Sequence, residues 1–531
     1  LPSGTYTAQA QQSDTATNTG FSAPTTFTVD ATAPTVTNVS STSLDGAYST
    51  GSVIPVTVTF SEPVNVVGTP TLTLAVGTSR AVNYTSGSGT STLTFNYTVQ
   101  AGDISADLNY AATTSLTAGT TIRDAAGNDA NRTLPGLAAA GSLATNKNIV
   151  IDTTAPGLPT VSSTTPASPA NNNAPAVKGS AESGSTVTIY TASGCGVASL
   201  TASGTQAAFA GTGITANVSD DTTTTFFAKA TDAAGNTSAC SATSVSYIED
   251  STPPAVTLTK VNNAAVTFPL TTNTNVTSIG GACGTATRDV LTVSWSATDG
   301  ITPQNGSVSC TSGTWTATLT TALSAAGNYT VSATQSDGPN TGTTGNKSIT
   351  IDKTAPTVVS INRADASPTN AGTVDWTVTF SKAVTGVDST DFALAGTATT
   401  GATFSSPTGS GATYNVAAST GAGDGTLGLN LADNDSISDA AGNKLSGTGT
   451  GTPGSGGVGN GSFTGATYAI DKTAPTTGAT ATVTGGASYS SDSWTNKDVS
   501  LTLSPSDTGG SGLAGTFYKI DGGTASSYTG A

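Results

Sequence analysis

Acidic side chains are the residues of this chain best suited to chemistry, and most of them are aspartates. The 531-residue sequence has 32 acidic residues, of which only Glu62, Glu182 and Glu249 are glutamates. Five aspartates recur in one context, after an apolar stretch and just before Thr or Ser and a proline, as in "ITIDKTAP". They lie roughly 100 to 120 residues apart, which is a domain length. We term them the junction aspartates: Asp30, Asp152, Asp250, Asp352 and Asp471.

A second aspartate recurs between the junctions, at the head of the sequence "DAAGN". The three copies begin at Asp124, Asp232 and Asp439, and a looser copy, "SDGPN", contains Asp337. Calcium takes six to eight hard oxygen ligands, so carboxylates of the turn before a junction could join the junction aspartate and nearby backbone carbonyls. The pattern predicts calcium sites at the junctions, with these candidate ligands: Asp30, Asp124, Asp152, Asp232, Asp250, Asp337, Asp352, Asp439 and Asp471.

The same aspartates have a purely structural alternative. The aspartate of "DAAGN" would close a turn by accepting hydrogen bonds from its own backbone, and its glycine would supply a positive φ. The junction aspartate would then only end a strand. Neither set matches the spacing of an EF-hand loop, and the sequence leaves both interpretations open.

Other kinds of site are disfavoured by composition. The chain has no histidine, so it cannot build a Ser-His-Asp or Cys-His arrangement, and neither a phosphate-binding loop nor a GxSxG elbow is present. The cysteines lack the spacing of a zinc site, and the acids lie in repeating turns, unlike the unique carboxylate pair of a glycosidase. We expect no enzymatic activity and no catalytic residues.

Charge and hydropathy restrict the partners. The net charge is −16, which would repel a nucleic-acid backbone and attract cations. No apolar stretch is long enough for a membrane-spanning helix. No leader sequence is visible at residue 1, so any targeting signal is expected to lie outside this segment.

The elements that must position these side chains are β-strands. Apolar residues alternate with polar ones in "IPVTVTF" (54–60), "TLTFNYTV" (92–99) and "WTVTF" (376–380), with Gly, Ser, Thr, Asn and Asp between such runs. No helical stripe is comparable. Three tryptophans, Trp295, Trp315 and Trp376, occupy alternating strand positions and are expected in cores, whereas Trp494 is expected to be more exposed. The fold class is all-β, with tandem β-sandwiches.

The junctions divide the chain into six segments. Residues 31–151 and 352–470 form two long units, and residues 152–249 and 250–351 form two short ones. The chain is expected to begin and end inside a domain, and these are the two partial segments: 1–30, the C-terminal part of one domain, and 471–531, the N-terminal part of another.

The motifs together resemble the immunoglobulin-like repeats of giant bacterial surface adhesins. The junction "DxTAP", the "DAAGN" turn, "VTFSEPV" and "GTPTLTL" carry the resemblance, although the second long unit departs from it with "VTFSKAV" and lacks "GTPTLTL". It implies immunoglobulin-like sandwiches in an elongated array, displayed or secreted outside a bacterial cell, often with calcium stiffening the junctions. The partners it implies are neighbouring domains of a longer chain.

Cysteine usage is consistent with export. Cys195 and Cys240 fall in one short unit, Cys283 and Cys310 in the next, and only this pairing keeps both bridges within domains. We expect two disulfides and an oxidising compartment, with free buried cysteines as the alternative.

Function follows from repetition more than from any site. The first hypothesis is a stalk or spacer that holds a binding module of an adhesin away from the cell. The second is a subunit of an extracellular filament or surface layer that self-associates.

Overall fold

The computed structural model describes residues 1–531 except 118, 120, 448–460 and 530–531. The chain is almost entirely β, as predicted, with short helices at α1 (Leu143–Asn146), α2 (Gln206–Ala210), η1 (Val197–Ser199) and η2 (Ser389–Asp391). It divides into two compact units. One comprises Leu1–Thr252 with Gly338–Asn340, and the other comprises Pro253–Asp337 with Thr341–Ala531.

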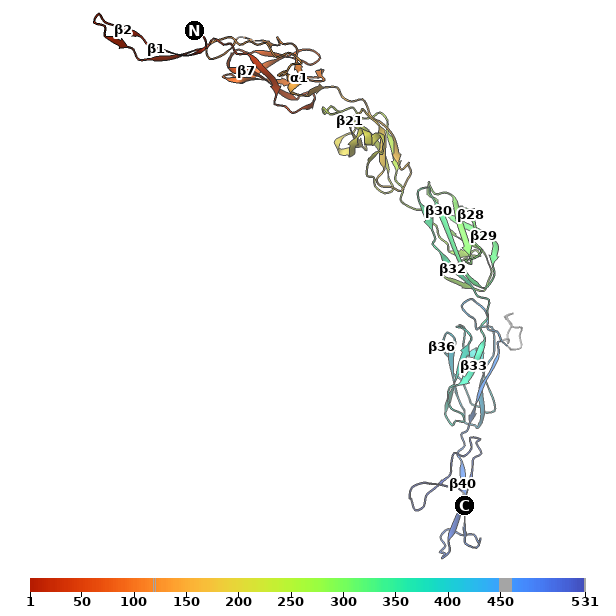
Figure 1. Ribbon diagram of the computed structural model, residues 1–531. Helices are drawn as coiled ribbons and strands as arrows, with labels where there is room; N and C mark the ends of the chain where they lie inside the picture. The colour runs from red at the N-terminus through yellow and green to blue at the C-terminus, as the bar shows by residue number, and fades with distance from the viewer. Residues whose placement is uncertain (118, 120, 448–460, 530–531) are drawn as a thin grey trace. The chain divides into compact units, whose positions relative to one another are not determined.

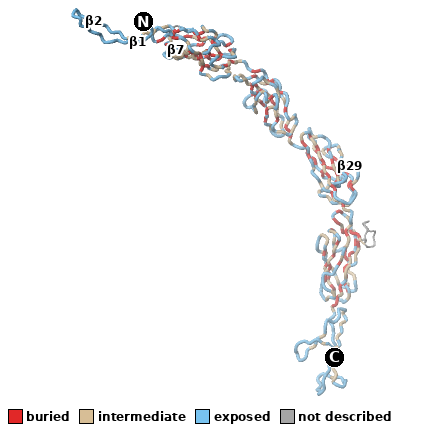
Figure 2. The backbone as a smooth tube through the Cα atoms, in the orientation of Figure 1, coloured by how far each residue is buried: buried red, intermediate tan, exposed pale blue. Residues whose placement is uncertain are grey.

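Each compact unit contains two separate hydrophobic cores, which lie within the four segments predicted as complete domains. Figure 2 shows these blocks of buried residues, and in contrast residues 1–30 and 472–529 are mostly exposed. The positions of the five boundaries between the six segments remain a prediction.

The first unit begins with two small hairpins. β1 (Gly4–Ala8) pairs with β4 (Thr25–Val29), and β2 (Gln11–Ser13) pairs with β3 (Thr19–Phe21). Nearly all of their residues are exposed, so these hairpins have no core of their own in this structure.

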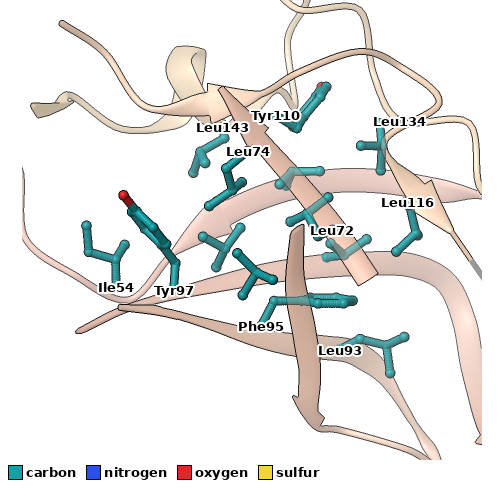
Figure 3. Packing of buried hydrophobic residues seen from close by; sticks show 14 of the residues in the cluster. Ile54, Leu72, Leu74, Leu93, Phe95, Tyr97, Tyr110, Leu116, Leu134 and Leu143 are labelled. Atoms are coloured by element: carbon teal, nitrogen blue, oxygen red, sulfur yellow. The ribbon is translucent and has the colours of Figure 1, made fainter. Parts of the chain in front are cut away.

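The first long repeat, residues 31–151, is a sandwich of two sheets. One sheet has the order β12-β8-β9-β10-β7-β14, with β5 also paired to β7 and β13 to β8, and the other has the order β11-β15-β6. Burial alternates strictly along the first half of β7, as the period of two requires. Leu74, Phe95 and Leu143 lie in the resulting core (Figure 3). The strands are β5 (Val36–Ser41), β6 (Gly46–Tyr48), β7 (Val53–Val67), β8 (Thr71–Ala75), β9 (Arg80–Ser86), β10 (Thr90–Thr98), β11 (Ile104–Ser105), β12 (Asn109–Tyr110), β13 (Leu116–Thr117), β14 (Thr121–Arg123) and β15 (Ile149–Asp152).

The first short repeat, residues 152–249, has sheets in the orders β16-β17-β20 and β19-β18-β21-β22. Phe209 of α2 and Tyr247 are completely buried in its core. The strands are β16 (Thr160–Thr165), β17 (Ala176–Ser180), β18 (Thr186–Tyr190), β19 (Leu200–Thr205), β20 (Ile214–Thr215), β21 (Thr223–Thr231) and β22 (Val245–Ile248).

The second short repeat, residues 250–351, has sheets in the orders β24-β23-β26-β29 and β25-β32-β30-β27-β28, with β31 paired to β30. Trp295 and Trp315 are buried in its core, as predicted. The strands are β23 (Lys260–Val261), β24 (Ala264–Ala265), β25 (Leu270–Thr272), β26 (Val276–Ala282), β27 (Thr292–Thr298), β28 (Gln304–Ser309), β29 (Thr314–Leu323), β30 (Gly327–Ser336), β31 (Thr341–Thr343) and β32 (Lys347–Ile351).

The second long repeat, residues 352–470, has sheets in the orders β33-β34-β37-β36 and β35-β38-β39. Trp376 is completely buried and meets Tyr468 edge to face, with ring centres 5.0 Å apart. The strands are β33 (Val358–Arg363), β34 (Thr373–Phe380), β35 (Phe392–Ala395), β36 (Thr408–Ser410), β37 (Thr413–Ser419), β38 (Gly425–Leu431) and β39 (Phe463–Ile470).

The C-terminal segment consists of two more hairpins. β40 (Thr476–Val483) pairs with β41 (Val499–Ser506), and β42 (Phe517–Tyr518) pairs with β43 (Ser526–Ser527). Trp494 is fully exposed there, as predicted.

A parallel contact closes each of the four sandwiches. β15 runs parallel to β6 and β32 runs parallel to β25. In the other two repeats, single parallel bridges join Ala170 to Glu249 and Thr369 to Ile470. The strand that leads out of each repeat, such as β32 in Figure 1, is therefore held against an early segment of the same repeat, immediately before the next junction aspartate.

Both predicted disulfides are present. Cys195 is bonded to Cys240, and Cys283 to Cys310, so each bridge stays within one short repeat. None of the described helices is both long and apolar enough to cross a membrane.

Candidate functional site: the junctions between repeats

The "DAAGN" sequence folds as a turn closed by its own aspartate. Asp124 Oδ1 accepts a hydrogen bond from the backbone N–H of Asn128 at 2.9 Å, and Oδ2 accepts one from Asn128 Nδ2 at 2.6 Å. Asp232 with Asn236, and Asp439 with Asn443, form the same two bonds. These aspartates act as turn formers, which is the structural alternative drawn from the sequence.

Glycine is favoured at the fourth position of this turn. Gly127, Gly235 and Gly442 have φ values of 97°, 93° and 87°, in the left-handed region that disfavours a Cβ. A related turn at Asp14 places Thr17 there at φ 71°. The backbone of the turn thus presents the asparagine side chain in one fixed orientation.

The asparagine of each "DAAGN" turn, and that of the "SDGPN" turn, binds a junction. Its Nδ2 donates to the backbone carbonyl of a junction aspartate: Asn128 to Asp30 at 3.1 Å, Asn236 to Asp152 at 2.9 Å, Asn340 to Asp250 at 2.8 Å and Asn443 to Asp352 at 2.9 Å. The contact joins residues 84 to 98 positions apart in the chain. The same clamp therefore recurs at four of the five junctions.

The prediction about which turn meets which junction was wrong. The sequence analysis joined each turn to the junction that follows it, so that Asp124 would meet Asp152. In the structure each turn meets the junction that opens its own repeat, because the turn and the incoming chain lie at the same end of the sandwich. The linker is thereby attached to the repeat that it enters.

The junction aspartates also stabilise the linker backbone locally. Oδ1 of Asp30, Asp152, Asp352 and Asp471 accepts a hydrogen bond from the N–H two residues later, at 2.9 to 3.1 Å. This is the turn that aspartate forms with its own backbone. It orients the chain just before the proline, whose ring fixes φ.

The repeat that precedes a junction holds the linker as well. The hydroxyl of Thr153 donates to the Asp103 carbonyl at 3.0 Å, and that of Thr252 donates to Asp221 Oδ2 at 2.6 Å. The Thr473 hydroxyl bonds Asp424 in the same way. The candidate residues drawn from the sequence do not include these acceptors: Asp103, Asp221 and Asp424.

A repeated signal could have identified two of the missed aspartates. Asp103 and Asp424 both end the sequence "AGD", once in each long repeat. The hydroxyl of Thr252 lowers the pKa of Asp221, and that of Thr473 lowers the pKa of Asp424. Both carboxylates are thus charged acceptors, which form stronger hydrogen bonds than neutral ones.

One junction gathers three carboxylates. Asp30, Glu62 and Asp124 each place an oxygen within 4.8 Å of the others, a spacing suited to a metal ion. Desolvation, together with the charges of Asp30 and Asp124, raises the pKa of Glu62, whereas the Asn128 amide lowers the pKa of Asp124. No other such trio occurs among the residues that the structure describes. The sequence analysis did not include Glu62, although it stands in the conspicuous "VTFSEPV".

The second long repeat has a lysine at this place. Lys382 Nζ lies 2.7 Å from Asp352 Oδ2 and 3.1 Å from Asp439 Oδ2, and it donates to the Thr354 carbonyl at 2.6 Å. Desolvation lowers the pKa of Lys382, but its bonds to Asp352 and Asp439 outweigh this and raise it. The ammonium group and two carboxylates form a compact ionic cluster.

The remaining predicted calcium ligands have other contacts. Asp152 and Asp232 are linked through the side chain of Asn236. Asn340, which belongs to the same turn as Asp337, donates to the carbonyl of Asp250. Asp471 Oδ2 accepts the N–H of Ser511 at 2.9 Å, and the bonds from Ser511 lower its pKa. Of the nine candidates, the structure brings only Asp30 and Asp124 into an acidic trio.

Comparison with known proteins adds little to this geometry. No protein-family model and no curated protein matches the chain. Among solved structures, the FN1–FN3 domains of chicken CNTN1 match 55% of this chain and 95% of their own length, with 12% identity and a TM-score of 0.19. Similarity at this level carries no functional information.

Proposed function

We propose that this chain is a stalk or spacer segment of a large extracellular bacterial surface adhesin. The observation that carries the proposal is the recurrence of one junction clamp, in which the asparagine of the "DxxxN" or "DGPN" turn binds the carbonyl of the junction aspartate. Because the same hydrogen bond recurs at four junctions, it restrains the linker in the same way each time. Such control is what a spacer needs, because its task is to keep two ends apart.

The energetics of the clamp favour a stiff link. At the junction of Asp152, Asn236 holds the carbonyl from one side and the Asp103 loop holds Thr153 from the other. Each such bond contributes about 1 kcal/mol net, so two or three together strongly reduce the population of bent linkers. Gly/Ser linkers of similar length have no comparable restraint.

Composition and covalent structure support the extracellular setting. The two disulfides suit an oxidising compartment. Low charge density, with 9% charged residues, suits a surface that interacts weakly with its surroundings. The chain has no histidine, and we propose that it is not an enzyme.

We also propose that the trio of the first long repeat binds calcium. Asp30, Glu62 and Asp124 supply three carboxylates, and the Thr32 carbonyl lies beside the same turn, where Asn128 reaches it at 3.4 Å. This set of ligands is rich in oxygen and negatively charged, so it suits a hard divalent cation whose remaining coordination positions are filled by water. The other candidate aspartates are then turn formers.

The stalk proposal is tested by small-angle scattering of the full chain. The triple variant Asn128→Ala, Asn236→Ala and Asn443→Ala is expected to broaden the distribution of dimensions relative to the parent chain. Asn83→Ala, an exposed strand position, is the matched control. Indistinguishable scattering curves for the parent and the triple variant would refute the proposal that the clamp stiffens the junctions. A molecular mass that grows with protein concentration would favour the second hypothesis, a filament subunit.

The calcium proposal is tested by isothermal titration of the chelator-treated chain with calcium chloride. The parent is expected to show a saturable site, which Glu62→Gln weakens at least about tenfold because one charged ligand is lost. Equal binding by parent and variant would refute the assignment of Glu62.

A further inference from the structure

The two long repeats place different charges at one structural position. Ser61 and Ser381 precede Glu62 and Lys382 in "VTFSEPV" and "VTFSKAV". The two serines have the same contacts: each hydroxyl accepts the N–H of the threonine after the junction proline, Thr35 at 3.1 Å or Thr357 at 2.9 Å. Each serine N–H also donates to the carbonyl of that threonine at 2.8 Å. The next side chain therefore starts from the same place and faces the same two aspartates.

The lysine has the contacts of a bound cation. Its ammonium lies between Asp352 and Asp439 and also binds the Thr354 carbonyl, so it is surrounded by two carboxylates and a backbone oxygen. Its side chain is 26% exposed and that of Asp439 only 4%, so solvent screens the Lys382–Asp439 pair only partly. In the first long repeat, the equivalent pair Asp30 and Asp124 faces a third carboxylate in place of an ammonium.

We propose that the residue at this position decides whether a junction needs a metal ion. Lys382 is a fixed internal cation, so the junction of Asp352 is closed without metal. Glu62 leaves the junction of Asp30 with three negative charges, so that junction closes fully only when a divalent cation is bound. This inference rests on the calcium site proposed above, and it adds that exchanging the two residues exchanges the metal dependence.

The test is hydrogen–deuterium exchange of the full chain, measured by mass spectrometry with calcium chloride or with chelator. The reporters are peptides covering Asp124–Asn128 and Asp439–Asn443, because the N–H groups of Asn128 and Asn443 close the two turns. In the parent, calcium is expected to slow exchange about tenfold at the first turn, a factor that corresponds to about 1.4 kcal/mol. At the second turn it should have no effect.

Two variants at Lys382 separate the two proposals. Lys382→Met keeps the apolar stem but removes the charge, and it is expected to speed exchange at the second turn about tenfold in chelator. Lys382→Glu is expected to do the same in chelator and to regain protection with calcium. The control is Lys444→Glu, which makes the same change in charge at an exposed residue directly after this turn. It should leave the exchange of the second turn unchanged both in chelator and in calcium.

The outcomes are distinguishable. If the parent shows no calcium effect at the first turn, the calcium site fails, while the effect of Lys382→Met still tests the internal cation. If Lys382→Met leaves exchange unchanged, the lysine does not close its junction and the inference is wrong. If the first turn responds to calcium but the Lys382→Glu turn does not, the position does not decide metal dependence. Unchanged exchange in β34 verifies that the variants are folded.

Discussion

The first and second long repeats form the same junction with different electrostatics. In both, the turn asparagine holds the junction carbonyl, and the junction aspartate closes its own backbone turn. In the first repeat the two aspartates meet Glu62, and in the second they meet Lys382. The comparison teaches that the clamp itself depends on amide and carbonyl groups, and that the charge beside it is a separate variable.

The cores of the two repeats also differ, at the strand that leads to this position. Val56 of β7 and Trp376 of β34 stand at the same place in "VTVTF" and "WTVTF", and both are completely buried. Trp376 additionally donates from Nε1 to the Ala466 carbonyl at 2.7 Å. Equivalent junctions are thus supported by different packing.

The largest expected effect comes from these core positions. Trp376→Ala is expected to destabilise the second long repeat by about 3 to 5 kcal/mol, because it leaves a cavity and an unpaired carbonyl. Val56→Ala is expected to cost the first repeat about 2 kcal/mol. Native-state hydrogen exchange in β34 and β7 measures the two costs separately. Equal losses would show that the two cores are supported alike despite the difference in volume.

The disulfides test whether the long repeats are stabilised independently of their neighbours. Replacing Cys195 and Cys240, or Cys283 and Cys310, by alanine is expected to cost its short repeat up to about 4 kcal/mol, since the closed loops are long. The long repeats contain no cysteine and should show unchanged exchange. A loss of protection in β7 or β34 would show that stability is shared across junctions.

The turn glycines should be equivalent in the two long repeats. Gly127→Ala and Gly442→Ala are each expected to cost about 1 to 2 kcal/mol, because alanine is strained at positive φ. Exchange at the N–H groups of Asn128 and Asn443 reports the loss. Ala125→Gly and Ala440→Gly are the controls at exposed neighbouring positions. A large effect in only one repeat would contradict the view that both use one clamp.

The smallest effects are those of pH, and they should have opposite signs. The folded pKa of Glu62 is raised above its usual 4.5, so its contribution favours the fold at low pH and is lost as pH rises through the raised pKa. The folded pKa of Asp352 is lowered below its usual 3.8, mainly by Lys382, so its contribution is present above 3.8 and is lost on acidification. The pKa of Asp124 is lowered below its usual 3.8, so its contribution to stability has the opposite pH dependence to that of Glu62, but it changes only at more acidic pH.

Both pH dependences are measured in chelator, at a series of acidic pH values. Hydrogen exchange at each of the two turns is used to follow thermal unfolding of the chain. Raising the pH through the glutamate range is expected to loosen the turn of Asp124 and to leave the turn of Asp439 intact. Glu62→Gln should abolish the first trend without altering the second. Parallel pH profiles at the two turns would contradict the charge difference between the junctions.

The pairing of turns with junctions shows where prediction from the sequence failed. The "DAAGN" aspartates were recognisable because the motif recurs, and their turn geometry follows from local chemistry. Which junction they meet depends on which loops share one end of a sandwich. Asp30 and Asn128 are 98 residues apart, and no local pattern records such a contact. Glu62 was missed for the same reason, since a single glutamate within a strand has no partner that is visible in the sequence.

The sequence by itself determined the features set by short-range rules. Alternation of apolar residues determined the strands, recurrence predicted the repeats that contain the four cores, and confinement to single repeats favoured the pairs Cys195–Cys240 and Cys283–Cys310. Only the tertiary structure decided that each turn binds the junction that opens its own repeat, and that Glu62 and Lys382 face equivalent aspartates. These contacts depend on the packing of two sheets, which brings Glu62 within β7 or Lys382 just after β34 to one end of a sandwich, together with a distant turn and the incoming linker.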